Sequence, residues 1–240
     1  LDDMIKGASQ MMRNVGGRRG EVPPALFQRA GSMGPLACDA GHTARRRLRQ
    51  NPPVMDLSGY LRIQAHANAL SNHRLGAALA ALPDAAWHAP RTGFFPSLAR
   101  TLNHILAIDG YYIGALHGDA GLVEAYDAFA PAATAAAWQP RQQASDRRLV
   151  AFCDALDAGR ADAWVELPRR DHVQRDRVAH VLAHLFNHQT HHRGQAHAML
   201  SATDVAPPQL DEFMLPSEAH LRSAEMRALG WDEARVYAGV

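Results

Sequence analysis

A fourteen-residue stretch, HLFNHQTHHRGQAH from His184 to His197, holds five of the 14 histidines of the chain. A neutral imidazole binds divalent metal ions, and histidine also exchanges protons near neutral pH. The stretch therefore indicates a metal site, a proton relay, or only a local excess of one residue type. The positions of the histidines on the element that carries them distinguish these interpretations.

The segment from about residue 177 to 202 has the apolar spacing of a helix, so its histidines can be placed on a helical wheel. With His180 at 0°, the apolar residues lie between about 100° and 200°. His192 falls at about 120° and His188 at about 80°, whereas His184, His191 and then His180 lie progressively farther toward solvent. Because His188 and His192 are four residues apart, their imidazoles can share a metal ion.

A third ligand has to come from another helix. His66 and His73 lie about 120° to 140° from the apolar stripe of the first helical segment, and we exclude them. His104, in the second segment, adjoins a partly apolar flank and is possible. Without a third ligand, a pair of hydrogen-bonded core histidines explains the spacing equally well. Gln189 follows His188 where H-E-x-x-H proteases have glutamate, so a protease of that type is not expected.

Apolar residues recur at helical spacing in four long segments. These are residues 56–82, 96–116, 141–157 and 177–202. Pro96 is expected in the first turn of the second helix. Residues 118–140 are predicted to be mainly a long crossover, 164–167 a short extended piece, and 209–229 one or two short helices.

These segments predict an all-α domain over residues 55–240, a four-helix bundle with long crossover connections. Residues 1–54 have many glycines and prolines and no sustained apolar period, so we expect a poorly ordered basic extension. The first 50 residues hold nine basic and four acidic side chains, a net charge of +5, which leaves −4 on the other 190. An acidic body argues against a nucleic-acid-binding protein.

Composition narrows the class of protein further. The hydrophobic fraction of 47% over 240 residues is typical of a globular chain. Two cysteines, Cys38 and Cys153, provide neither a disulfide framework nor a thiolate zinc site, so we expect a reducing compartment and a cytoplasmic protein. No run approaches the ~20 apolar residues of a membrane helix, and we find no secretory signal pattern.

The residues from Asn187 to Gln195 resemble the N-H-x-x-x-H-R-G-Q signature of the DinB family, the DinB/YfiT-like metal-binding four-helix proteins. Other similar pieces occur in the order of that family: Asn68-x-x-x-Asn72-x-x-Leu75, Phe95-Pro-Ser-Leu-x-x-Thr-Leu-Asn-His104-Ile-Leu-x-x-Asp109 and Pro207-Pro-x-Leu-Asp211. The resemblance covers the chain from about Asp56 onward. It implies a metal triad of His104, His188 and His192, a homodimer, and similarity to thiol S-transferases and a mycothiol-dependent isomerase.

Three histidine ligands leave a zinc or nickel ion with open coordination positions, as in catalytic sites. The first hypothesis is therefore a metal-dependent transferase that acts on a small-molecule thiol and a small electrophile. A metal-dependent hydrolase and a non-catalytic metal-binding protein of the stress response are the alternatives. Asp109, His184, Asn187 and Gln189 are candidates to orient the ligand imidazoles. Arg193 could bind a substrate carboxylate or form a surface salt bridge, and the sequence identifies no catalytic residue.

Overall fold

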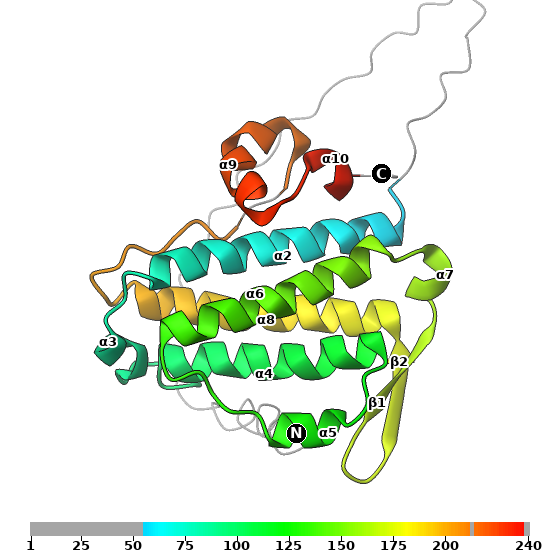
Figure 1. Ribbon diagram of the computed structural model, residues 1–240, viewed down its shortest axis with the longest axis horizontal. Helices are drawn as coiled ribbons and strands as arrows, with labels where there is room; N and C mark the ends of the chain where they lie inside the picture. The colour runs from blue at the N-terminus through cyan, green and yellow to red at the C-terminus, as the bar shows by residue number, and fades with distance from the viewer. Residues whose placement is uncertain (1–54, 212–213, 238–240) are drawn as a thin grey trace, which may run out of the picture. The chain divides into compact units, whose positions relative to one another are not determined.

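The computed structural model describes residues 55–211 and 214–237, so the extension expected for residues 1–54 lies outside the described residues. Four long helices of the described part form a bundle (Figure 1). They are α2 (Leu57–Leu79), α4 (Leu98–His117), α6 (Ala135–Asp154) and α8 (Val178–Leu200). The prediction of an all-α four-helix bundle is confirmed.

The four helices do not alternate in direction along the chain. Helices α4 and α8 run antiparallel side by side, as do α2 and α6, whereas the neighbours α4 and α6 point the same way (Figure 1). Parallel neighbours need a connection that returns along the bundle. Residues 118–134 make this crossover, and they include the short helix α5 (Leu122–Asp127), which the sequence did not predict.

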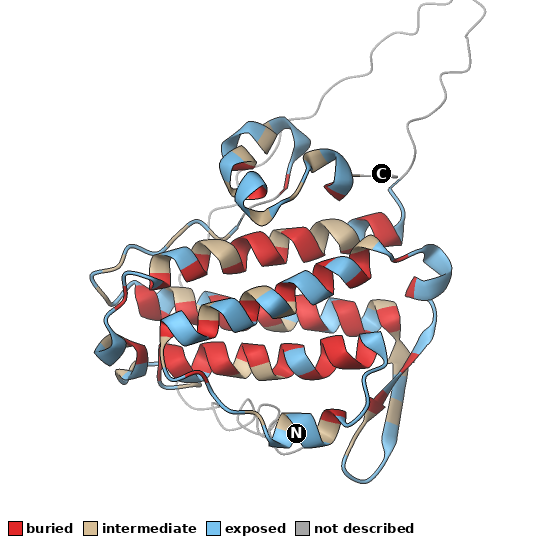
Figure 2. Ribbon diagram, viewed as in Figure 1, coloured by how far each residue is buried: buried red, intermediate tan, exposed pale blue. Residues whose placement is uncertain are grey.

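Buried residues, most of them apolar, occur along all four long helices (Figure 2). Helix α2 buries two asparagines, Asn68 and Asn72, in the same stripe as its leucines. The short helix α3 (Asp84–His88) adds Trp87 to the core, where its ring lies 6.4 Å from that of Trp138 on α6. The bundle interior therefore contains a polar layer beside its apolar core.

Two helices begin at other residues than predicted. Ser97 caps α4 through its side chain, so Pro96 lies before the helix and not in its first turn. Helix α6 begins at Ala135, capped by Thr134, although Pro140 was expected to precede it. A proline in a helix removes one backbone hydrogen bond. The threonine cap and the burial of Trp138 accompany this early start.

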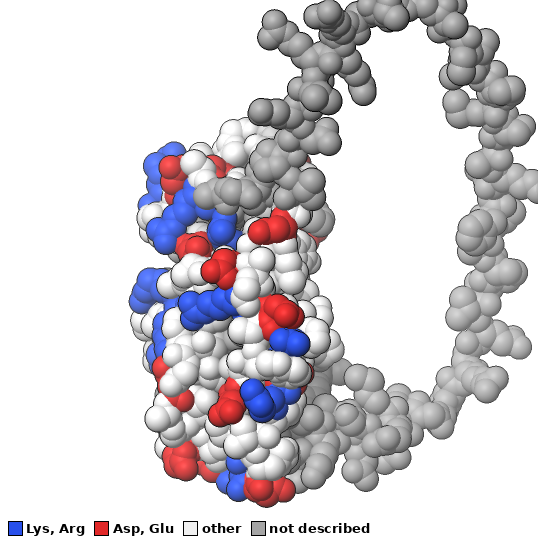
Figure 3. Space-filling view, turned by 90° about the vertical axis from the view of Figure 1, so that its right-hand side faces the viewer, with Lys and Arg blue, Asp and Glu red and all other residues white. Residues whose placement is uncertain are grey.

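A β-hairpin connects α6 to α8. After the short helix α7 (Ala158–Ala161), strand β1 (Trp164–Pro168) pairs antiparallel with β2 (Val173–Arg177). The extended piece predicted at 164–167 corresponds to β1. Strand β2 was not predicted, because its sequence VQRDR lacks the apolar alternation of a half-buried strand. Acidic and basic side chains are interspersed on the face of the molecule shown in Figure 3.

The C-terminal residues pack on α2 and α6. They form the 3₁₀ helix η1 (Pro216–Glu218), α9 (Ala219–Leu229) and α10 (Glu233–Val236). Arg74 on α2 forms an ion pair of 2.6 Å with Glu225, and Arg235 forms one of 2.7 Å with Asp154 on α6. The prediction of short helices in residues 209–229 is confirmed for α9, while α10 lies beyond the predicted range.

Candidate metal centre

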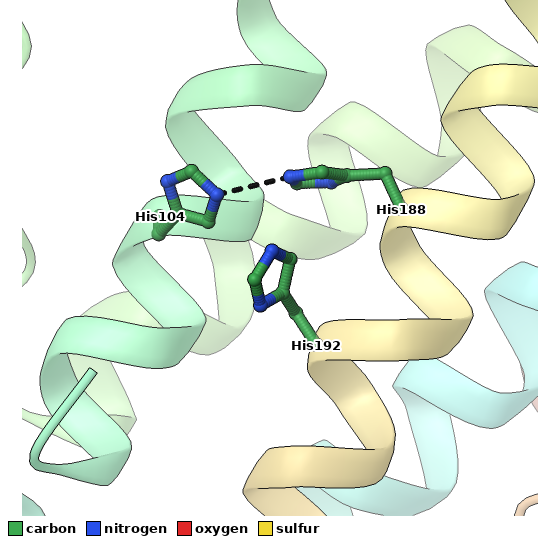
Figure 4. Close-up of side chains that lie close together, drawn as sticks. All are labelled: His104, His188 and His192. Carbon is green, nitrogen blue, oxygen red and sulfur yellow. Dashed lines mark hydrogen bonds between the residues drawn. The ribbon is translucent and has the colours of Figure 1, made fainter. Parts of the chain in front are cut away.

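Three histidines converge between α4 and α8. His104 extends from α4, and His188 and His192 extend from successive turns of α8 (Figure 4). One nitrogen of each ring can be chosen so that all three lie within 4.8 Å of one another. The Nε2 atoms of His104 and His188 are 2.9 Å apart. The structure thus brings together the three residues that the family resemblance implied.

Burial keeps these imidazoles neutral. It lowers the pKa of His104 to about 3, with a further contribution from the neighbouring His192. Burial likewise lowers the pKa of His188 to about 3, and it lowers the pKa of His192. Because a metal binds the lone pair of a neutral imidazole, the three rings are in the protonation state that binding requires.

The spacing of the nitrogens fits a single divalent ion after a small adjustment. Two ligand atoms on a tetrahedral ion, each bonded at about 2.0–2.1 Å, lie about 3.3 Å apart. The observed 2.9 Å between His104 and His188 is slightly shorter than that distance because one imidazole donates a hydrogen bond to the other. Nitrogen donors alone suit zinc and nickel better than magnesium or calcium.

Gln195 orients one of the rings. Its Oε1 accepts a hydrogen bond of 2.8 Å from Nδ1 of His192, which leaves the Nε2 lone pair of that ring available to a metal. The Nδ1 atoms of His104 and His188 are buried without a hydrogen-bond partner in the described part of the chain. Gln195 was not among the predicted site residues, although its position three residues after His192 places the two side chains together on a helix.

The four residues predicted to orient the ligands differ in their surroundings. Gln189 donates a 2.9 Å hydrogen bond to Asp109 inside the bundle, so these two side chains join α8 to α4 instead of contacting an imidazole. Asn187 is exposed. His184 is also exposed, but its ring lies 6.1 Å from that of His188. Of the four, His184 is the one with a ring contact to a candidate ligand.

Arg193 lies inside the bundle and not on its surface. It is only 6% exposed, and its Nη1 donates to Oδ1 of Asn68 at 2.6 Å and of Asn72 at 3.0 Å. The alternative of a surface salt bridge is therefore wrong. Arg193 lies beside the apolar residues of α8, on a flank that α2 covers. These contacts bind Arg193 to the interior of the protein.

His66 is excluded from the metal group, but for a reason different from the one predicted. It is fully buried, its Nε2 donates a 2.9 Å hydrogen bond to Asp154, and its ring meets Trp231 edge-on at 4.5 Å. The wheel placed it toward solvent because the packing of the C-terminal segment on α2 is not visible in the sequence of α2.

An aromatic ring closes one side of the triad. Phe95, in the loop before α4, lies 4.4 Å from the ring of His104 and 5.5 Å from that of His192, measured between centroids. The exposed Phe94 packs edge-on against it at 4.7 Å. The third ligand, His188, instead neighbours His184, which packs on Tyr112 at 5.1 Å. An apolar ring therefore borders the site beside His104 and His192, whereas a polar ring borders it beside His188.

The fold and site together define a class of protein, a helical bundle with three convergent histidines on two antiparallel helices. The chain belongs to the DinB family: the model of that family matches residues 62–226. No curated protein matches the sequence. Among the described residues, none of the helices combines the length and the apolar character needed to cross a membrane.

Proposed function

We propose that His104, His188 and His192 bind one divalent ion, zinc or nickel, and that the loaded protein transfers a small-molecule thiol to a small electrophile. The convergence of three neutral imidazoles supports this proposal, since such a set provides three ligands and leaves coordination positions for reactants. A bound ion of this kind lowers the pKa of a coordinated thiol and so supplies a thiolate at neutral pH.

The protein's own residues organise the site around that chemistry. Gln195 holds the ring of His192 in the tautomer that ligation needs. Phe95 excludes water from the side of His104 and His192. Reactants therefore approach on the side of His188 and His184, where the neighbouring rings are polar.

A second candidate function is metal binding without catalysis, in a stress response. The contact of Phe95 with two of the three rings favours it, because an aromatic side chain at 4.4 Å leaves less room for a substrate beside His104. A metal-dependent hydrolase is the third candidate, and it would use coordinated water in place of a thiol.

The proposal includes a cytoplasmic homodimer. The low cysteine content supports the cytoplasmic location, and the family resemblance supports the dimer. Sedimentation of the purified full chain tests the dimer, and a single species of monomer mass at all concentrations would contradict it.

Elemental analysis of the purified full chain tests the metal site. We expect about one zinc or nickel ion per chain, and strongly reduced occupancy in the His104→Ala and His192→Ala variants. His220→Ala is the matched control because this histidine is exposed on α9. Full occupancy in both triad variants would refute the triad.

Thiol consumption by the loaded protein, followed with a panel of small electrophiles, tests the activity. We expect turnover in the wild-type protein and in His220→Ala, and loss of turnover in His188→Ala. A wild-type rate no greater than that of His188→Ala would exclude the transferase. Hydrolysis of ester substrates without thiol, if it were lost in the same variant, would favour the hydrolase instead.

A further inference from the structure

A cavity of about 440 Å³ lies at the end of the bundle where α4 ends and α8 begins, beside α7 and the β-hairpin (Figure 1). Its volume is within the range of about 300–1,000 Å³ that small-molecule sites have. Ala115 and Val178 line it, 11 residues after His104 and 10 residues before His188. Both are therefore about 15 Å or more along their helices from the proposed ligands, so this hairpin cavity is separate from the candidate metal centre.

The buried part of the lining is apolar. Five such side chains, each at most 9% exposed, come from α4, α5, α6, β1 and α8: Leu116, Leu122, Phe152, Val165 and Val178. Trp164 also lines the cavity and is 54% exposed, so an aromatic ring forms part of the rim. Covering apolar surface of this kind releases water and is favourable. The hairpin cavity therefore favours a ligand with an apolar body.

The charged part of the lining has one residue without a counter-charge. Asp119, Arg160 and Glu166 line the cavity. Asp119 forms an ion pair of 2.7 Å with Arg148. Oε1 of Glu166 lies 3.9 Å from Nε of Arg175. Arg160 forms no ion pair within the part of the chain that the structure describes, so its positive charge is available to an anion.

Two contacts position Arg160 beside the apolar lining. Asp157 caps α7 by accepting a hydrogen bond of 2.7 Å from the backbone nitrogen of Arg160. Cζ of Arg160 lies 4.4 Å from the ring centroid of Phe152. A guanidinium that stacks on a ring keeps the N–H groups at its edge available, and these match the two oxygens of a carboxylate. A carboxylate can therefore bind Arg160 while an apolar body covers the buried lining.

The neighbouring acids limit the charge of the ligand. Asp119 and Glu166 line the same cavity, so a second acidic group on the ligand would be repelled. One guanidinium also provides fewer donors than the oxygens of a phosphate accept. A molecule with a single carboxylate fits this lining best.

We propose that the hairpin cavity binds a small organic monocarboxylate, with its carboxylate on Arg160 and its apolar body against Phe152, Trp164 and the buried side chains around them. This site is additional to the histidine triad and does not depend on the function proposed for it.

Binding of phenylbutyrate to the full chain tests the proposal. Phenylbutyramide is the neutral analogue, and acetate is the acid without an apolar body. We expect a dissociation constant for phenylbutyrate on the order of 1 mM, as is usual for a ligand of this size, and saturation-transfer NMR detects such binding. The amide and acetate should bind at least about fivefold more weakly, because each lacks one of the two interactions.

Two exposed residues separate the charge from the apolar contact. Arg160→Gln should weaken phenylbutyrate binding about fivefold and leave phenylbutyramide binding unchanged. Trp164→Ala should weaken the binding of both compounds by the same factor. Arg227→Gln and Leu221→Ala are the matched controls, since both residues are exposed on α9, and they should bind both compounds like the wild type.

The variant His104→Ala/His192→Ala tests whether the acid binds a metal ion at the triad instead. We expect it to bind phenylbutyrate with the wild-type dissociation constant. Loss of binding in this variant would locate the acid at the triad and overturn the proposal. Retained binding in a protein that holds no metal would leave the hairpin cavity intact even if the proposed function failed.

Three other results overturn the proposal. The first is equal affinity for phenylbutyrate and phenylbutyramide, and the second is an unchanged affinity for phenylbutyrate in Arg160→Gln. The third is the absence of phenylbutyrate binding. If sedimentation then showed a dimer that Trp164→Ala dissociates, a second copy of the chain would be the occupant of this surface.

Discussion

A buried charge network next to the metal centre makes a prediction that can be worked out in detail. Nε2 of Gln142 donates to Asp109 at 3.0 Å and to Asp146 at 3.1 Å, in the polar layer that also contains Arg193. Burial raises the pKa of Asp109 to about 8 and that of Asp146 to about 7. Near neutral pH one of the two carboxyls therefore keeps its proton. The single negative charge of the other then balances the positive charge of the Arg193 guanidinium.

The hydrogen bonds indicate which substitutions the network tolerates. Asp146 accepts both of its bonds, from Asn72 and Gln142, at Oδ1, so Asp146→Asn can keep that oxygen and should cost at most about 1.5 kcal/mol. Asp109 accepts at both oxygens, from Gln189 and Gln142. Asp109→Asn turns one acceptor into a donor that faces another donor, which costs about 1–3 kcal/mol.

The double variant Asp109→Asn/Asp146→Asn should lose more free energy of unfolding than the two single variants lose together. It leaves the Arg193 guanidinium buried without a counter-charge, and breaking a buried pair in this way costs about 3–5 kcal/mol. We therefore expect the loss of stability to exceed the sum of the single losses by about 2 kcal/mol or more.

Urea denaturation of the metal-free protein at pH 7, followed by helical circular dichroism, measures the four free energies of the cycle. Asp119→Asn is the matched control, because that aspartate forms an exposed ion pair of 2.7 Å with Arg148 and should contribute less than about 1 kcal/mol. Additivity of the two network substitutions within about 0.5 kcal/mol would show that charge balance does not govern this network.

Three further predictions concern protonation and reactivity. Because burial lowers the pKa of His104 and His188 to about 3, the unfolded chain binds more protons below the usual histidine pKa. From the usual aspartate pKa up to about pH 8, the folded state in turn holds protons on Asp109 and Asp146 that the unfolded chain has released. The free energy of unfolding of the metal-free protein should therefore rise between about pH 3 and 4, change little up to about pH 6.5 because the two histidines and the two carboxyls offset each other, and fall from there to about pH 8; a profile without a decrease above pH 6.5 in urea titrations would contradict this. Gln195→Ala should weaken metal binding about 10–100-fold in chelator competition, and an unchanged affinity would mean that its bond to His192 does not set the tautomer. Burial raises the pKa of Cys153 to about 12, so in a Cys38→Ser variant, where Cys153 is the one remaining thiol, Ellman's reagent should modify it at the rate of unfolding, and rapid labelling in native buffer would contradict its burial.

The parts of this protein that follow from helical periodicity could be predicted from the sequence. The wheel separated His188 and His192 from their more exposed neighbours because the ring of a helical residue follows its angle around the axis. His104 could not be selected in that way, since its partners lie on another helix and the pairing of α4 with α8 is a property of the assembled bundle. The family signature supplied that step.

The wrong predictions have a common physical origin. A helical wheel identifies the main apolar face of a helix but not the other elements that cover its remaining faces. His66 and Arg193 lie off the main apolar stripes of α2 and α8, yet both are buried because other elements cover those flanks. The start of α6 was missed because Pro140 was given more weight than the cap at Thr134. Strand β2 was missed because its residues are polar and its partner strand, not a buried face, determines its conformation.

The residues that directly follow the two α8 ligands, Gln189 and Arg193, are both hydrogen-bonded in the bundle interior. Gln189 and Arg193 therefore fix the position of α8 in the bundle, and the same helix carries the two ligands. A shift of either side chain would rotate and translate α8, and both imidazoles would move together. Protein engineers could exchange a ligand to change the preferred metal while that alignment persists. Substitution of Gln189 or Arg193 would instead change the positions of both ligand nitrogens at once.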